Sequence, residues 1–295
     1  MGPAMNEFVQ LTVNGLVAGS IIAIGAVGLT LVYGILRIVN FAHGDYLTFG
    51  AYMAFVANVT WGLNAYAAAA TAIVLTAALA VGLEFGLWRP MRRRGAGVTS
   101  LFLTSIGLAL VLRNAVQFEW GTTPFRYRID VFQSYDLGLF RISRNQITVV
   151  AAATVLIVGL GLFLARTRIG KAMRALADNV DLAAVSGIDT DRIVTWTWIV
   201  AGGLAGLAGM LLAVLQASLN PNSGFNALLP MFAAVVLGGV GSAYGALAGG
   251  IVIGLAMELS TLAVPFQYKE AVAFGVMILA LLLRPQGLFG RARVV

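Results

Sequence analysis

The chain has 295 residues, of which 60% are hydrophobic and 11% charged, and its mean hydropathy is +0.91. Soluble domains are typically about 45–50% apolar and about 25% charged, so this composition excludes a soluble protein and predicts one that crosses a membrane several times. The formal net charge is +7. Its basic residues lie in short segments between apolar ones, so the positive-inside rule explains this charge without a nucleic-acid partner.

Several residue types and motifs that enzymes use are missing. There are no cysteines and one histidine, His43, which excludes disulfides, thiolate metal sites and clusters of histidine ligands. The ATP-binding motif GxxxxGK(S/T) does not occur, and the nearest string, Ile169-Gly170-Lys171-Ala172, lacks the upstream glycine and the hydroxyl residue. No nucleophile stands with a base beside it. We expect no catalytic residue, metal or cofactor, and any ATP hydrolysis must occur on a partner.

A membrane-spanning helix needs about 20 apolar residues. We predict an all-α polytopic membrane protein with about eight to nine membrane helices, some of them broken, in one domain over residues 1–295. The spans are expected at about 8–36, 45–60, 65–87, 99–118, 146–165, 193–219, 228–242, 246–264 and 268–284. The segments 45–60 and 228–242 are short and flanked by glycine, which indicates half-spanning helices. Residues 1–10 hold no Lys or Arg, so we expect the first span to be retained rather than cleaved.

The loops predict an orientation. Residues 88–97 carry four arginines and no acid, which places this loop in the cytoplasm. Counting crossings then places 119–144 outside, and 166–192 and the tail with Arg291 and Arg293 inside. The outer segment holds four arginines against three acids, but long segments count for less in this rule.

The first short segment follows a polar turn in YGILRIVNFAHGDYLTFGAY, over Tyr33–Tyr52, that contains Asn40, His43 and Asp45. One interpretation is a turn at the membrane surface, with Asp45 capping the next helix. His43 and Asp45 then pair with each other or with Arg37. The alternative is a gate or a contact with a partner subunit.

Glycines mark two further features. The string GGLAGLAG, with Gly202, Gly206 and Gly209, predicts close packing of helix backbones. In LGGVGSAYGALAGG, over Leu237–Gly250, the glycines around Gly239 and Gly241 predict a break between two half-helices. Two breaks in the two halves of a chain indicate a transporter built from repeats, although the sequence similarity between the two segments does not decide this.

Glu84, Arg113 and Glu258 are charged residues within predicted spans. We expect Glu84 to pair with Arg89 or Arg92, and Arg113 to extend outward to the membrane surface. Glu258 is an acid in the interior of a late span. Its role is either in a pathway or proton relay, or in a structural pair.

The segment 166–192 is the longest polar interruption, with five basic and four acidic residues at helical periodicity. Such a helix cannot remain in hydrocarbon, so it must lie on a water-facing surface. Its apolar face is formed by Ala172, Met173, Leu176 and Ala177. A helix on lipid headgroups is one interpretation, but the near balance of charge favours docking into a partner protein.

Several strings together resemble a known family: GLTLVYGILRIVNFAHGDYLTFGAY, LWRPMRR, FLTSIGLALVLRN, WGTTP, TRIGKAMRALADNVDLAAVSGID and MFAAVVLGGVGSAYGALAGGIVIGL. In this order, over about residues 11–290, they resemble Liv-type H-subunit permeases of branched-chain amino-acid ABC importers. The resemblance implies a multi-pass protein of the bacterial inner membrane. It also implies a sister permease, two cytoplasmic ABC ATPase subunits and an extracytoplasmic substrate-binding protein.

In that family the cytoplasmic block is the coupling helix that docks into the ATPase. Its contacts in this chain would be Arg168, Gly170, Lys171, Arg174, Asp178 and Gly187. One departure is Leu229-Pro230, where family members often carry a basic residue. The change there is either related to substrate or a helix start.

We therefore expect half of a translocation pathway for branched-chain or related amino acids. The expected gate or pathway residues are Asn40, His43, Asp45, Gly239, Gly241 and Glu258. Three alternatives remain: an ion-coupled secondary transporter with Asp45 and Glu258 as ion sites, a passive channel, and an ABC permease for urea or short amides.

Overall fold

The computed structural model describes residues 3–128, 133–136, 138, 140–284 and 286–289. Within them, seven helices are long and apolar enough to cross a membrane, and the predicted all-α polytopic fold is confirmed. The predicted tail arginines, Arg291 and Arg293, lie outside the described residues. The helices are α1 (Pro3–Leu36), α2 (His43–Phe55), α3 (Ala65–Leu83), α4 (Arg89–Arg93), α5 (Val98–Trp120), α6 (Arg144–Arg166), α7 (Arg168–Asp178), α8 (Val180–Val185), α9 (Thr190–Gln216), α10 (Ser223–Gly238), α11 (Ala243–Leu259) and α12 (Lys269–Leu283).

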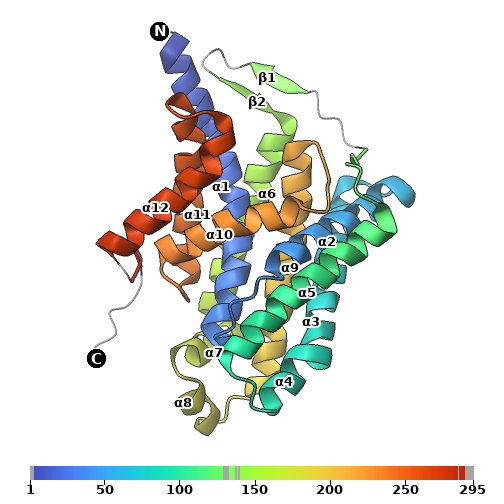
Figure 1. Cartoon of the computed structure of the whole chain (residues 1–295), viewed down its shortest axis with the longest axis vertical. Helices are drawn as coiled ribbons and strands as arrows, with labels where there is room; N and C mark the ends of the chain where they lie inside the picture. Colours follow the sequence, from blue (N-terminus) through green and yellow to red (C-terminus); the bar gives the residue numbers. More distant parts are fainter. Residues whose placement is uncertain (1–2, 129–132, 137, 139, 285, 290–295) are drawn as a thin grey trace.

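The two ends of the bundle differ in character (Figure 1). Helices α4, α7 and α8 lie at one end, together with the arginines of the 88–97 loop. At the opposite end lies an antiparallel hairpin of β1 (Ser134–Asp136) and β2 (Arg141–Ser143). This arrangement matches the predicted placement of 88–97 and 166–192 on one side and 119–144 on the other. Which side faces the cytoplasm stays a prediction.

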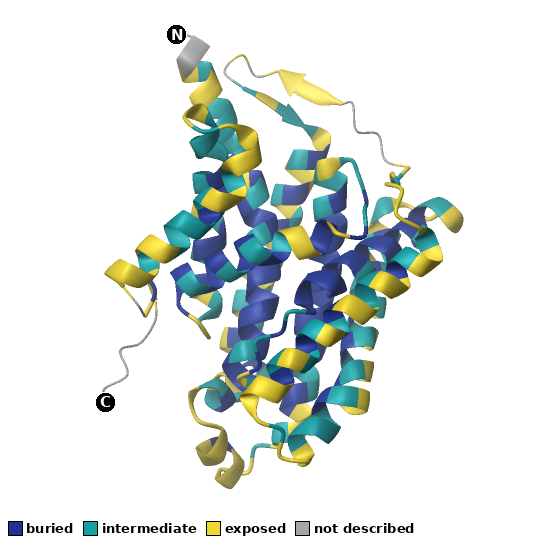
Figure 2. Ribbon diagram, in the orientation of Figure 1, coloured by how far each residue is buried: buried dark blue, intermediate teal, exposed yellow. Residues whose placement is uncertain are grey.

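Helices α1 and α9 are the most buried of the long helices, and α5 and α12 carry many exposed residues (Figure 2). Helix α6 is also mostly exposed, because 17% of its most apolar stretch is buried. In the most apolar stretch of α1, 89% of the residues are buried, against 6% for the segment that contains α12. Because both stretches are apolar, the outer helices must face lipid or another membrane subunit.

Glycines let the central helices touch, as predicted. A Cβ at Gly206 would lie 2.5 Å from the Ala72 carbonyl oxygen on α3. One at Gly209 would collide with the Leu47 carbonyl oxygen on α2, and Gly19 of α1 packs on the backbone of α11 at Gly250 in the same way. This close approach is how small residues drive helix packing in lipid.

The two halves of the bundle repeat one local structure. Helix α1 ends at Leu36 and Arg37 follows with φ 56°, while α9 ends at Gln216 and Ala217 follows with φ 48°. Each helix is thus followed by a left-handed residue, and 37 and 217 differ by 180.

The next turn repeats at the same offset. The side-chain oxygen of Asn40 accepts a bond from Ala42 N at 3.2 Å, and that of Asn220 accepts one from Asn222 N at 2.8 Å. A short helix then begins at His43 and at Ser223. The pairs 40 and 220, and 43 and 223, again differ by 180. These matched turns support the internal repeat that the sequence left open.

Candidate functional site

The two short helices of the repeat meet at their first turns. Gly44 of α2 and Gly224 of α10 are equivalent positions, and a Cβ at Gly44 would lie 2.6 Å from the Gly224 carbonyl oxygen. Gly224 N also donates to Thr48 Oγ1 at 3.1 Å. The first turns of both half-helices therefore lie in direct contact inside the bundle.

The turn that precedes α2 is buried, so the expectation of a membrane-surface turn is wrong. Asn40, His43 and Asp45 are almost inaccessible. The α2 helix begins at His43 after Ala42 with no side-chain cap, so Asp45 is not the cap. His43 Nε2 lies 2.9 Å from the Gly25 carbonyl oxygen of α1 rather than beside Asp45. The glycines of α1 leave room for this ring, because a Cβ at Gly28 would lie 2.9 Å from it.

Asp45 forms an ion pair with Arg113 of α5. Arg113 Nε lies 3.0 Å from Asp45 Oδ1, and Arg113 Nη2 lies 3.3 Å from Asp45 Oδ2. The Arg113 side chain is 14% exposed and the Asp45 side chain 1%. The expectation that Arg113 extends outward is therefore wrong, because a buried carboxylate retains the guanidinium. The guanidinium also lies 4.1 Å from the centroid of the Phe225 ring. Phe225 is the α10 position 180 residues after Asp45, so one arginine joins equivalent sites on α2 and α10.

The second predicted break is confirmed. Helix α10 ends at Gly238, and Gly239 and Gly241 follow with φ 101° and 89°, a region that favours glycine. The Ser242 side chain then caps α11 through Gly245 N at 3.0 Å. Gly241 N donates to Thr30 Oγ1 of α1 at 2.9 Å, so the break is fastened to the central helix.

The buried acid Glu84 links α4 to α9 at the end of the bundle that carries α4. Glu84 accepts bonds from Arg92 and, at 2.7 Å, from the indole N–H of Trp198 on α9. The predicted pair with Arg92 is confirmed, whereas Arg89 pairs with Asp191.

The predicted coupling segment is two helices rather than one. Helix α7 ends at Asp178, and the Asn179 side chain caps α8 through Leu182 N at 2.9 Å. Of the predicted apolar face, Met173 and Leu176 are buried against this chain's own bundle, and Ala172 and Ala177 are partly buried. The exposed surface instead combines charged α7 residues (Arg168, Lys171, Arg174 and Asp178) with two apolar residues of α8 (Leu182, 63% exposed, and Val185, 83%). We call these six residues the end surface.

Of the two glycines expected to contact an ATPase, one is exposed and the other is buried. Gly187 is exposed, with φ 85°. Gly170 is buried, and a Cβ there would collide with the backbone at Phe163 and Leu164. Gly170 therefore seats α7 on α6 and is not part of the exposed surface.

Helix α7 touches the region of both breaks. Arg37 Nη2 donates to the Ala177 carbonyl oxygen at 3.1 Å, so Arg37 contacts α7 rather than His43 or Asp45. A Cβ at Gly34 would lie 3.5 Å from Gly241 and 3.9 Å from Ala177. The end of α1, the second break and α7 therefore meet around Gly34.

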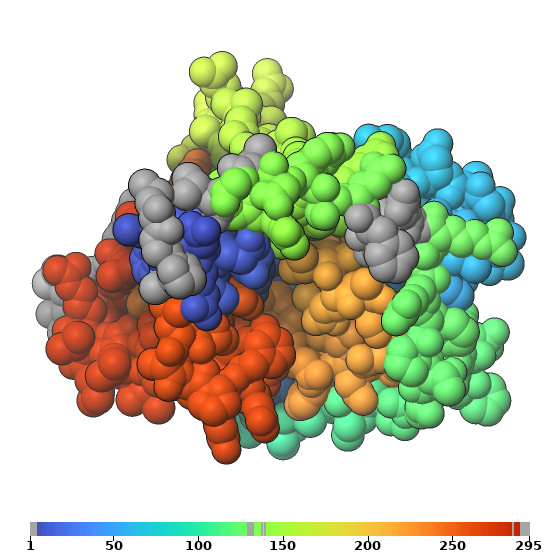
Figure 3. Space-filling model, turned by 90° about the horizontal axis from the view of Figure 1, so that it is seen from above, coloured from blue at the N-terminus to red at the C-terminus, as the bar shows by residue number. Residues whose placement is uncertain are grey.

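A cavity of about 340 Å³ lies at the other end of the molecule. Seen from the hairpin end, the surface is hollowed between the blue N-terminal helix, the light orange end of α9 and the red-orange start of α12 (Figure 3). Its lining residues come from seven helices: Asn14, Ala18, Ile21, Ile22, Leu47, Gln146, Leu212, Leu215, Gln216, Asn226, Ala227, Pro230, Met231, Met257, Glu258, Lys269 and Glu270. Pro230 lies inside α10 and not at a helix start, so that expectation is wrong.

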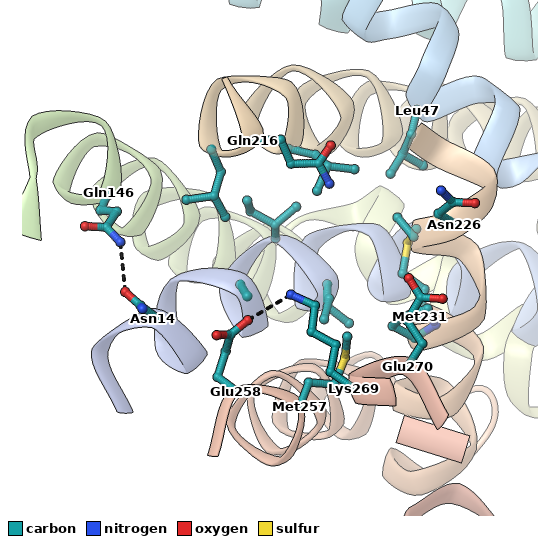
Figure 4. A pocket seen from close by; sticks show the side chains of 17 residues that line it. Asn14, Leu47, Gln146, Gln216, Asn226, Met231, Met257, Glu258, Lys269 and Glu270 are labelled. Atoms are coloured by element: carbon teal, nitrogen blue, oxygen red, sulfur yellow. Dashed lines mark hydrogen bonds and ion pairs between the residues drawn. The ribbon is translucent and has the colours of Figure 1, made fainter. Parts of the chain in front are cut away.

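The charges of this cavity gather on one wall (Figure 4). Lys269 Nζ lies 3.2 Å from Glu258 Oε1, and the ammonium lies 4.0 Å from the Phe266 ring centroid. Glu258 thus both forms a pair and lines a cavity. Glu270 has no ion-pair partner among the described residues. On another wall, Gln146 Nε2 donates to Asn14 Oδ1 at 3.1 Å.

The hairpin end also has its own ordered contacts. Phe125 and Leu219 exchange backbone hydrogen bonds of 2.9 Å, which fastens the segment after α5 to the α9–α10 turn. The Tyr127 hydroxyl donates to the Ala51 carbonyl oxygen at 2.8 Å. In the hairpin, the Gly138 N–H and then Arg141 hold the pKa of Asp136 below its usual value, so this carboxylate is ionised at neutral pH.

Two features of this geometry were missed in the sequence. The first is the ion pair between Glu258 and Lys269, the residue that begins α12. The two residues are 11 positions apart on either side of a predicted loop, and this spacing of an acid and a base was the signal that could have indicated the pair. The amide side chains of Asn14, Gln146 and Gln216 come from three helices that are far apart in the sequence, and no local pattern marks them as lining one cavity.

Comparisons with known proteins agree with this architecture. The family model described as "Branched-chain amino acid transport system / permease component" matches residues 11–281. BraD of Pseudomonas aeruginosa, a high-affinity branched-chain amino acid transport system permease protein, is 35% identical, and the match covers 99% of both chains. Two high-affinity branched-chain amino acid transport system permease proteins of Escherichia coli are also similar. LivH is 33% identical over 97% of both chains, and LivM is 26% identical over 90% of this chain and 67% of its own.

Among solved structures, PsaBC from Streptococcus pneumoniae in complex with Fab matches with a TM-score of 0.51 and 15% identity. The match covers 95% of this chain and 92% of that one. At this identity the likeness supports the fold alone.

Proposed function

The chain belongs to the family of branched-chain amino acid transport permeases, and from this membership we propose that it forms half of the translocation pathway of an ABC importer for branched-chain amino acids. In this proposal separate ATPase subunits drive it, and it performs no chemistry. The observation that carries the proposal is the contact of α7 with the region of both helix breaks, through Arg37 and Gly34.

The ATPase subunits dock on the end surface. Its exposed cations and its two apolar residues suit a protein groove, because an exposed apolar patch rimmed by polar groups is typical of a protein interaction site. Arg168, Lys171, Arg174, Asp178 and Gly187 make this contact. Gly170 contributes indirectly, by seating α7 against α6.

Motion of α7 then reaches the pathway through two connections. One is the bond between Arg37 and Ala177, which leads to the turn at Asn40 and His43 and to α2. The other is the packing of Gly34 between Ala177 and Gly241, which leads to the second break and α11. The Asp45–Arg113 pair ties α2 to α5 and, through Phe225, to α10, so these helices move together.

The buried turn holds a polar atom that has no direct partner in this conformation. His43 Nδ1 is buried and has no hydrogen-bond partner within the described residues. In the proposed gate the turn moves between two conformations, and this atom gains a partner in the second.

Other subunits complete the machine. LivH and LivM of E. coli are each a high-affinity branched-chain amino acid transport system permease protein, and both resemble this chain, which supports a heterodimer with a sister permease. The exposed apolar faces of α5 and α12 suit that subunit or lipid. A substrate-binding protein delivers its cargo at the hairpin end, and the importer lies in the bacterial inner membrane.

The alternatives are less well supported. An ion-coupled transporter needs Asp45 or Glu258 as an ion site, yet Arg113 and Lys269 already neutralise these acids. A permease for urea or short amides does not need the long apolar walls of the cavity.

The test is a pull-down of the tagged chain from its native membrane in mild detergent, with mass spectrometry. We expect a second multispan permease and nucleotide-binding subunits. A chain that purifies alone, and transports alone, contradicts the proposal.

A further inference from the structure

We propose that the cavity at the hairpin end is a binding site for a zwitterionic aliphatic amino acid, with Lys269 binding its carboxylate and Glu258 and Glu270 its ammonium. The inference rests on the proposed function and deepens it, because it names the residues and the substrate class. It assigns this chain a binding site of its own, apart from that of any binding protein.

The charged wall fits a zwitterion. Lys269 Nζ is held by Glu258 at 3.2 Å, but an ammonium has three donors, and the side chain is about a quarter exposed toward the cavity. A carboxylate can therefore bind it without breaking the pair. Glu270 adds a second carboxylate, unpaired among the described residues, which leaves an acceptor for the ligand's ammonium.

The same wall disfavours anionic ligands. One cation, Lys269, and two anions, Glu258 and Glu270, leave the lining with one net negative charge. An anionic ligand such as a fatty acid brings a charge that this wall repels, and the second carboxylate of a dicarboxylic amino acid meets the same net negative charge. A neutral zwitterion satisfies both signs and adds no net charge.

The remaining walls fit an aliphatic side chain. Ile21 and Ile22 of α1, Leu212 and Leu215 of α9, and Met231 and Met257 supply apolar surface. The volume of about 340 Å³ lies at the low end of the range of about 300–1,000 Å³ for small-molecule sites. The cavity therefore accommodates one small molecule and not a peptide.

The position of the cavity connects occupancy to the moving parts. Leu47 belongs to the half-helix α2, and Asn226, Ala227, Pro230 and Met231 belong to the half-helix α10. An occupant touches both half-helices just beyond the Gly44–Gly224 contact. Its binding free energy can thus differ between two arrangements of these helices, which is the requirement for a ligand to shift them.

The experiment uses the full-length chain in the complex with which it co-purifies, in nanodiscs, without binding protein or nucleotide. Binding of tritiated leucine is measured directly, and leucinamide, which lacks the carboxylate, competes with it. In the wild type we expect leucine to bind at least tenfold more tightly than leucinamide. In Lys269→Gln we expect leucine to weaken about tenfold and leucinamide to stay within twofold, so the preference disappears.

A second set of variants guards against misfolding. Ala227→Phe fills the cavity from α10 while keeping every charge, and it should abolish leucine binding. The double variant Lys269→Gln/Glu258→Gln removes both partners of the pair, so no charge is left unpaired, and it should still lose the preference for leucine. The controls are Arg94→Gln and Glu7→Gln, two exposed charges with no ion pair in the described chain, and they should bind as the wild type does.

The outcomes separate this inference from the proposed function. Leucine binding that is unchanged in Lys269→Gln and Ala227→Phe overturns the cavity site. A parallel loss of leucine and leucinamide in Lys269→Gln assigns Lys269 a purely structural role and also overturns the inference. ATP-driven leucine uptake by the whole importer that is unaffected by Ala227→Phe leaves the proposed function standing. Absence of any ATP-driven leucine uptake in the wild type counts instead against the proposed function.

Discussion

The guanidinium of Arg37, at the end of the first membrane helix, donates a hydrogen bond of 3.1 Å to the carbonyl oxygen of Ala177 in α7. The two residues are 140 positions apart, and the bond joins the surface proposed for the ATPase to the turn that starts α2. Arg37 has φ 56°, a conformation that few side chains adopt, so the fold holds this residue in place.

The first prediction concerns this bond. In Arg37→Gln the side chain is too short to reach Ala177, and a hydrogen bond from a charged donor is worth about 1.5–3 kcal/mol. We expect leucine transported per ATP hydrolysed to fall about tenfold, with the protein still folded. Arg37→Lys, which keeps a charged donor, should retain part of the coupling. Unchanged coupling in Arg37→Gln would show that α7 acts through another contact.

The second prediction concerns the docking surface. Arg174 is exposed on α7, so Arg174→Glu should leave the chain folded in the membrane but uncouple ATP hydrolysis from transport. ATPase activity and uptake are measured in parallel in proteoliposomes. Arg94→Glu, a reversal at an exposed arginine outside α7 and α8, is the control. Normal uptake by Arg174→Glu removes the docking assignment.

The third prediction concerns helix packing. A Cβ at Gly206 would lie 2.5 Å from the Ala72 carbonyl oxygen, whereas nothing lies within 4 Å of one at Gly107 on α5. We expect Gly206→Ala to destabilise the protein by about 1–3 kcal/mol through overpacking. Gly107→Ala should be neutral or stabilising by up to about 1 kcal/mol. A charge at Gly206, as in Gly206→Glu, should prevent folding. Thermal unfolding in detergent measures all three, and equal stability of the two alanine variants would contradict the packing.

The fourth prediction concerns the buried ion pair. Asp45→Asn leaves the Arg113 guanidinium without its counter-ion, and breaking such a pair destabilises by about 3–5 kcal/mol. The double variant Asp45→Asn/Arg113→Gln leaves no unpaired charge and should recover much of this stability. The two melting temperatures decide the matter: if the double variant is less stable than Asp45→Asn, the unpaired guanidinium is not the main cause of the destabilisation.

Much of the architecture could be predicted from the sequence. Runs of about 20 apolar residues place the spans, and glycine clusters place the second break, because both signals are local. Partners across the fold could not be predicted in this way. Arg113 lies 68 residues from Asp45, so a basic residue near a helix end was interpreted as extending to the surface. The periodicity of the 166–192 segment predicts one helix with an apolar face and a balanced set of charges that docks into a partner protein. That face instead packs on the chain's own bundle, and the sequence does not show which surface an amphipathic helix covers.

The most direct test of the central claim is leucine uptake into proteoliposomes. The complex that co-purifies with this chain is compared with the chain alone, with ATP or with a sodium or proton gradient as the energy source. We predict uptake by the complex that requires ATP and the binding protein and is lost in Arg174→Glu. Uptake by the isolated chain that follows an ion gradient and ignores ATP would contradict the account, and would turn attention to Asp45 and Glu258 as ion sites.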